Sequence, residues 1–245
     1  MKKTVIILFL IFAPCSAYNY NSYCTDIVPS KTISGIAMST AGVNFLARKI
    51  VQKEMAKAFK KETGSDFKVN MDSFWGVNIA NGEFYKFSAV SENYSDKYLS
   101  AKKLEVVTVC PYNKINYENN KLIFDSDMVL KFNAEIDEYS LSKMLKQKVQ
   151  ILNDKICFIY KISAFGIKAS LKLKAGLEVV GNKIQLCNIE VNNKTLNASK
   201  YLDMLNLTNF NIDLSKDTKA HVQIDDVKIK NSNVYLTGHA IIPKG

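Results

Sequence analysis

The segment LIFDSDMVLKFNAEI, Leu122 to Ile136, alternates between apolar and polar residues, with Ile123 and Val129 as the apolar exceptions in the polar parity. Ser126 is the only polar residue in one parity, which otherwise holds Leu122, Phe124, Met128, Leu130, Phe132, Ala134 and Ile136. A period of two is typical of a strand with one buried face. Strands usually run about 5–6 residues, whereas this pattern would extend about 50 Å at ~3.3 Å per residue. We therefore expect one unusually long strand.

A helical pattern precedes the strands. Ser39 or Thr40 is the expected N-cap of a helix over residues 39–62, and Gly64 is the expected stop. Apolar residues recur in this segment at spacings of three and four, and they are Val43, Leu46, Ala47, Ile50, Val51, Met55, Ala58 and Phe59. Basic residues fill most of the remaining positions. We predict that Val43, Ala47, Ile50, Val51 and Met55 face the interior, so that Ile50→Asp would bury an unpaired charge and unfold the domain or empty an interior groove.

The rest of the chain favours antiparallel strands. Alternating patterns predict them over residues 67–71, 84–90, 104–110, 155–164, 167–180, 183–191, 219–230 and 234–242. Two short helices are expected between strand groups, at residues 137–146 and 198–205. Asp225 and Asp226, a doubled polar pair between Ile224 and Val227, indicate a β-bulge.

The N-terminus carries the features of a secretory leader. Lys2 and Lys3 precede an apolar run over residues 5–13, and Cys15-Ser16-Ala17 supplies a small-x-small cleavage site. An uncleaved anchor is the alternative, although the run is far shorter than the ~20 residues that span a bilayer. We therefore expect a signal peptide over residues 1–17, a loose lead-in over 18–38 and a single domain over 39–245. The mature protein would be extracytoplasmic, in the periplasm, in the cell envelope or secreted.

The charge of the chain has two interpretations. The formal net charge of +10 falls to +8 if Lys2 and Lys3 leave with the leader, and Arg48 is the only arginine among 33 basic residues. Readers of nucleic acid depend on the planar fork of arginine, so we expect no nucleic-acid partner. The lysine excess either reflects an AT-rich coding bias or attracts the protein to an anionic membrane surface.

Four cysteines remain after cleavage: Cys24, Cys110, Cys157 and Cys187. No C-x-x-C pair exists to indicate a zinc or redox site. Cys157 and Cys187 are expected on strands separated by a third strand, about 9.6 Å apart, which exceeds the ~7 Å limit for a disulfide. We expect buried free thiols, with a Cys24–Cys110 disulfide as the alternative.

No catalytic motif is present. The sequence lacks G-x-S-x-G, H-E-x-x-H, P-loop and G-x-G-x-x-G patterns. An enzyme of unrecognised type would need a polar cluster around His221, His239 and Asp226, and two histidines without a clustered nucleophile make a poor site. We therefore expect no catalytic residues, no metal site, no cofactor and no enzymatic activity.

The order of elements resembles the LmeA-type phospholipid-binding family of bacterial envelope proteins. The resemblance extends from about Gly42 to the end, through SFWGVNIANGEFYKFSA (73–89), AEIDEYSLSKML (134–145) and VKIKNSNVYLTGHAII (227–242), with Gly82 and Phe84 in place of the Gly-x-Phe of the family. The family's proline after the opening helix is absent, and Phe74-Trp75-Gly76 stand there instead. The resemblance implies an α+β, TULIP-like roll, in which a strongly curved antiparallel sheet wraps a long N-terminal helix beside two short helices.

This arrangement leads to a functional expectation. Long coiled strands around a helix could leave an elongated apolar groove for the acyl chains of a phospholipid, including anionic ones, with a role in envelope lipid transport or homeostasis. We predict that the groove is lined by Val43, Leu46, Ala47, Ile50, Val51, Met55, Leu122, Phe124, Met128, Leu130 and Phe132. A structural or interaction protein of the cell envelope with a solid core is the main alternative, and no sequence feature identifies a protein partner.

Overall fold

The computed structural model describes residues 33–71, 77, 79, 82–96, 99–110, 112–118, 121–124, 127–164, 167–192, 194–195 and 221–244. Most of these residues lie in antiparallel strands. The expected leader, most of the expected lead-in and the helix predicted at residues 198–205 lie outside the described residues.

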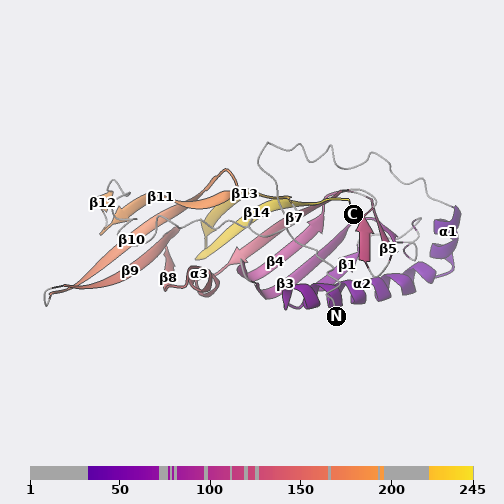
Figure 1. Ribbon diagram of the computed structural model, residues 1–245, viewed down its shortest axis with the longest axis horizontal. Helices are drawn as coiled ribbons and strands as arrows, with labels where there is room; N and C mark the ends of the chain where they lie inside the picture. The colour runs from indigo at the N-terminus through magenta and orange to yellow at the C-terminus, as the bar shows by residue number, and fades with distance from the viewer. Residues whose placement is uncertain are drawn as a thin grey trace.

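Two large sheets lie end to end along the long axis of the molecule (Figure 1). The six-stranded sheet contains, in spatial order, β1 (Lys68–Met71), β3 (Phe87–Ser95), β4 (Ser100–Thr108), β7 (Met128–Ile136), β14 (Asn233–Ile242) and β13 (His221–Lys230). The five-stranded sheet contains β12 (Lys194–Thr195), β11 (Lys183–Val191), β10 (Ile167–Val180), β9 (Lys155–Ala164) and β8 (Val149–Leu152). A third, small sheet contains β2 (Glu83–Phe84), β5 (Asn113–Glu118) and β6 (Lys121–Phe124).

Three helices accompany the strands in the described part of the chain: α1 (Ile33–Thr40), α2 (Val43–Thr63) and α3 (Glu138–Leu145). Gly42 and Gly64 flank α2, and both adopt the left-handed conformation that favours glycine. Gly64 donates its backbone N–H to the carbonyl of Lys60, which confirms it as the helix stop. Figure 1 shows that α2 runs along the six-stranded sheet, parallel to the long axis, and it contacts β1.

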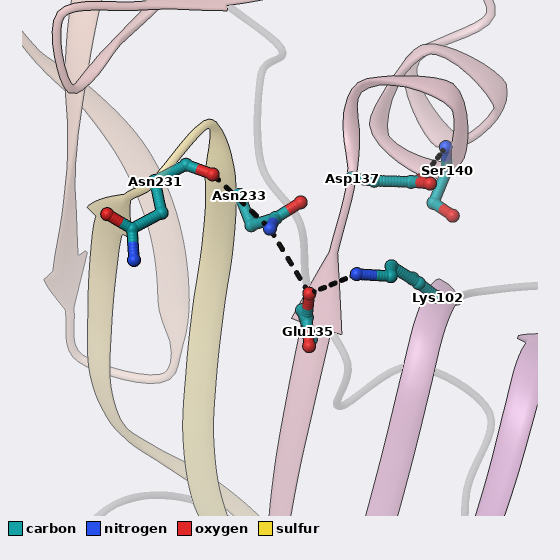
Figure 2. Close-up of polar contacts among 6 residues, drawn as sticks. All are labelled: Lys102, Glu135, Asp137, Ser140, Asn231 and Asn233. Carbon is teal, nitrogen blue, oxygen red and sulfur yellow. Dashed lines mark hydrogen bonds and ion pairs between the residues drawn. The ribbon is translucent and has the colours of Figure 1, made fainter.

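Helix α3 begins at a side-chain cap. The Asp137 carboxylate accepts a hydrogen bond of 2.8 Å from the backbone N–H of Ser140, which satisfies a donor that the helix itself leaves free (Figure 2). The prediction of a short helix here is confirmed. The predicted strands over residues 155–164, 167–180 and 183–191 are also confirmed, as β9, β10 and β11.

One apolar core extends through both large sheets. Strand register aligns the buried side chains: Met71 lies opposite Phe87, and Phe132 lies opposite both Val106 and Gly238. The same cluster includes Phe59 of α2 and continues into Phe158 and Leu173 of the five-stranded sheet. The two sheets therefore share a single interior.

Side chains satisfy backbone groups of strands at the junction of the two sheets. Asn182, in the turn between β10 and β11, accepts a hydrogen bond from Ile224 N and donates one to the Val222 carbonyl of β13. On β8, Ile151 N donates to the Glu138 carboxylate at 2.7 Å, and Val149 N donates to the Ser142 hydroxyl. Unpaired strand edges invite association with other chains, so these contacts also protect the fold.

The structure contradicts the predicted fold class. The described part of the chain is mostly β rather than an α+β roll, and its antiparallel sheets are not strongly curled around a long N-terminal helix. The helical segment is interrupted at Gly42, and α2 covers the β1 side of the sheet instead of filling its centre. Residues 33–38, expected to be loose, belong to α1.

The prediction of one long strand over residues 122–136 is also wrong. Residues 122–136 divide between β6, which pairs with β5, and β7, which pairs with β4 and β14. Asp127 lies just before β7, and its carboxylate accepts a hydrogen bond of 2.7 Å from Lys244 N beyond β14.

Candidate functional site

The residues predicted to line a groove occupy two different environments. Met128, Leu130 and Phe132 of β7 are buried in the main core, at 3%, 0% and 7% exposure. Val51 and Met55 of α2 pack partly buried against that core, and Ala47 is half-buried. Leu122 and Phe124 belong to β6, and the structure does not describe their side chains.

Three of the predicted groove residues face solvent. Val43 is 38% exposed, and Leu46 and Ile50 are each 63% exposed. The prediction that they point into the interior is therefore wrong. The inward stripe of α2 instead runs through Asn44, Val51, Met55 and Phe59. This orientation turns Val43, Leu46 and Ile50 outward.

Asn44 fixes the N-terminal end of α2. Its side chain is fully buried, and its amide donates to the Ser39 hydroxyl at 2.8 Å and to the Val77 carbonyl at 2.5 Å. Its carbonyl oxygen accepts a hydrogen bond of 3.3 Å from Ile79 N. Sequence reasoning missed this residue, although a polar side chain inside an apolar stripe was the available signal. The exposed residues beside Asn44 thus lie on an anchored helix.

An aromatic cluster fixes the other end of α2. The ring of Phe59 stacks on Phe67 at 4.8 Å between centroids, and Phe67 meets Tyr94 edge-on at 5.9 Å. The Tyr94 hydroxyl donates to the Asp96 carboxylate at 2.6 Å. Burial, followed by the nearby charge of Asp96 and this hydrogen bond, raises the pKa of Tyr94 far above its ordinary value.

The outward side of the two N-terminal helices carries a group of large apolar side chains. We call it the α1–α2 surface, and it consists of Ile36 of α1 with Val43, Leu46 and Ile50 of α2. Val43, Leu46 and Ile50 follow one another at helical spacings of three and four, so they share one face of α2. Helix α1, which carries Ile36, contacts α2. A fixed group of exposed apolar side chains of this kind indicates a binding surface.

Basic residues continue the outward face toward the C-terminal end of α2. The helix has six basic and two acidic residues. Lys57 pairs with Glu54 at 2.6 Å, and Lys60 pairs with Asp66 at 2.7 Å. Lys53 and Lys61 are exposed, and neither forms an ion pair with another described residue. Near the apolar end, the Lys49 ammonium lies 4.5 Å from the centre of the Phe45 ring.

His221 and His239 lie on the neighbouring strands β13 and β14, but the carboxylate that His239 contacts is not that of Asp226. His239 Nδ1 contacts the carboxylate of Asp225, the residue at the predicted bulge between β13 and β14. Asp226 pairs instead with Lys228. No group of three or more metal-ligating side chains occurs among the described residues.

A second polar cluster ties three strands together. Glu135 of β7 accepts a hydrogen bond of 2.7 Å from Lys102 Nζ of β4 and one of 3.1 Å from Asn233 Nδ2 of β14 (Figure 2). The hydrogen bond and the charge of Glu135 raise the pKa of Lys102. Each polar partner comes from a different strand, so the cluster has a clear structural role.

The cysteines differ in state. Cys157 and Cys187 are free, as their separation by β10 predicts. Cys110 is disulfide-bonded, and its partner lies outside the described residues. The expectation of a free thiol at Cys110 is therefore wrong.

Comparison with family models, curated proteins and solved structures found no match. Within the part of the chain that the structure describes, no helix is both long enough and apolar enough to cross a membrane.

Proposed function

We propose that this protein is a non-catalytic, extracytoplasmic phospholipid-binding protein, and that it contacts lipid through the α1–α2 surface. The observation that carries the proposal is the outward exposure of Leu46 and Ile50 on a helix that buried Asn44 and Phe59 hold in place. Apolar side chains that a fixed surface helix presents to solvent can be buried below the headgroups when the protein meets a membrane interface.

The energies favour a reversible surface contact. Full burial of a large aliphatic side chain contributes about 1.5–3 kcal/mol. The side chains of the α1–α2 surface are 38–63% exposed, so each can contribute about 1 kcal/mol more on entering lipid. Four such residues would give a gross gain of about 4 kcal/mol, before the cost of immobilising the protein.

Two further features support an extracytoplasmic setting. The N-terminal residues have the pattern of a secretory leader, and a disulfide at Cys110 is typical of an oxidising compartment. The resemblance of the sequence to LmeA-type proteins also supports the proposal, although the structure does not have the roll that this resemblance implies. A role in envelope lipid transport or homeostasis, with acyl chains held in a groove, remains a prediction.

An interaction protein of the cell envelope is the second candidate. Burial of Met128, Leu130 and Phe132 within one packed cluster favours it, because these side chains occupy the interior themselves. In that case the α1–α2 surface would contact a protein instead of lipid.

Vesicle co-sedimentation tests the proposal. We expect Leu46→Asn with Ile50→Asn to weaken binding about tenfold or more, because these changes remove apolar contact without altering charge. The matched control is Leu152→Asn with Ile159→Asn, two exposed apolar residues of the five-stranded sheet. Absence of wild-type binding, or equal losses in the two double variants, would contradict the proposal and favour the interaction protein.

A further inference from the structure

The outward face of α2 changes character along its length. Its first half presents Val43, Leu46 and Ile50. Its second half presents Lys53, Lys57, Lys60 and Lys61, all exposed. The apolar residues and the lysines therefore share one face but occupy successive turns of the same helix.

Helix α2 keeps a net positive charge after its ion pairs are taken into account. Glu54 and Asp66 partly neutralise Lys57 and Lys60. Lys53 and Lys61 remain without ion pairs to other described residues, and Lys49 adds a further positive charge to the helix. Exposed ion pairs hold their lysines only weakly, so the paired lysines can also exchange partners.

We propose, resting on the function proposed above, that the occupant of the α1–α2 surface is an anionic phospholipid bilayer. The first half of α2 inserts between lipids, and the lysines of its second half bind headgroup phosphates. Charge complementarity favours this occupant, because an apolar surface followed by a basic one matches the layered chemistry of an anionic membrane.

The position of α2 also sets the orientation of the bound protein. The helix runs parallel to the long axis of the molecule, and α1 lies at one end of it (Figure 1). Because the apolar residues precede the lysines along this axis, the bound helix would be tilted, with its α1 end deeper in the bilayer than its C-terminal end.

The two halves of α2 should respond differently to salt and to lipid charge. Each lysine that is attracted to an anionic leaflet should raise the affinity of the protein for the vesicle about fivefold. Salt at about 1 M shortens the screening distance to about 3 Å and should remove this preference. Apolar insertion should persist under the same conditions, because it does not depend on charge.

The experiment measures co-sedimentation with phosphatidylcholine vesicles and with vesicles that also contain phosphatidylglycerol. The test variant combines Lys53→Gln with Lys61→Gln, and the control combines Lys183→Gln with Lys230→Gln, exposed lysines of β11 and β13. Both variants lower the net charge equally. We expect only the test variant to lose affinity for anionic vesicles, by about fivefold per lysine, while its weak binding to neutral vesicles stays unchanged.

The outcomes separate this inference from the function on which it rests. Equal wild-type affinity for the two vesicle types, or equal losses in both lysine variants, would overturn the anionic assignment. If Leu46→Asn with Ile50→Asn still weakened binding to both vesicle types, the proposed function would stand alone. Failure of the wild type to bind either vesicle would overturn both.

Discussion

Strand β7 and the first half of α2 carry similar apolar side chains in opposite environments. Leu130 of β7 is fully buried between neighbouring strands, whereas Leu46 of α2 is 63% exposed. Both were expected to line the same groove. Register with β4 and β14 fixes Leu130, while Asn44 turns Leu46 away from the core. An apolar pattern therefore identifies which residues share a face, but the neighbouring elements decide whether that face is covered.

The largest expected effect separates the two leucines directly. Leu130→Ala should lower the free energy of unfolding by about 2–5 kcal/mol, because it leaves a cavity in a packed core. Leu46→Ala should change it by about 0.5 kcal/mol or less. Urea unfolding of both variants checks this, and similar losses would contradict the assigned environments.

The anchor of α2 should give the next largest effect. Asn44→Ala leaves the Ile79 N–H and the Val77 carbonyl without their partner, at a cost of about 1–3 kcal/mol. Thr40→Ala is the control, since its exposed hydroxyl bonds only the nearby Ile36 carbonyl in the described hydrogen bonds. Thermal unfolding should show a clear loss for Asn44→Ala alone; an unchanged midpoint would remove Asn44 as the anchor.

The opposite end of α2 should be sensitive to alkaline pH. The raised pKa of Tyr94 means that the unfolded chain loses this proton first, near the ordinary value of 10.0. Stability is therefore complete below about pH 10 and falls above it, by about 1.4 kcal/mol per pH unit from this group. Urea unfolding across this range checks the slope, which Tyr94→Phe should reduce. An unchanged slope in the variant would exclude Tyr94 as its source.

The smallest effect on stability is expected at Ile50. The interior position predicted from sequence would make Ile50→Asp unfold the protein. Because Ile50 is 63% exposed, we now expect a change of about 0.5 kcal/mol or less. Circular dichroism during heating checks this expectation, with wild-type protein as the reference. A collapse of the fold would restore the interior assignment.

Local signals predicted the elements that depend on local chemistry. Asp137 and Gly64 indicated helix ends, and alternation over residues 155–191 indicated β9, β10 and β11. The break between β6 and β7 was missed because the alternation continues across it, although the two strands join different sheets. The outward face of α2 was missed because large apolar residues lie on more than one side of its first half, and the contacts of Asn44 and Phe59 select the buried side.

The most direct test of the central claim measures how deeply the α1–α2 surface enters lipid. Tryptophan placed at Leu46 or at Val180, an exposed apolar residue of β10, would report contact with vesicles of brominated phospholipid. Wild-type protein supplies the background from Trp75. We predict strong quenching above background for Leu46→Trp and none for Val180→Trp. Equal quenching at the two positions, or none at Leu46→Trp when the protein is vesicle-bound, would contradict the claim.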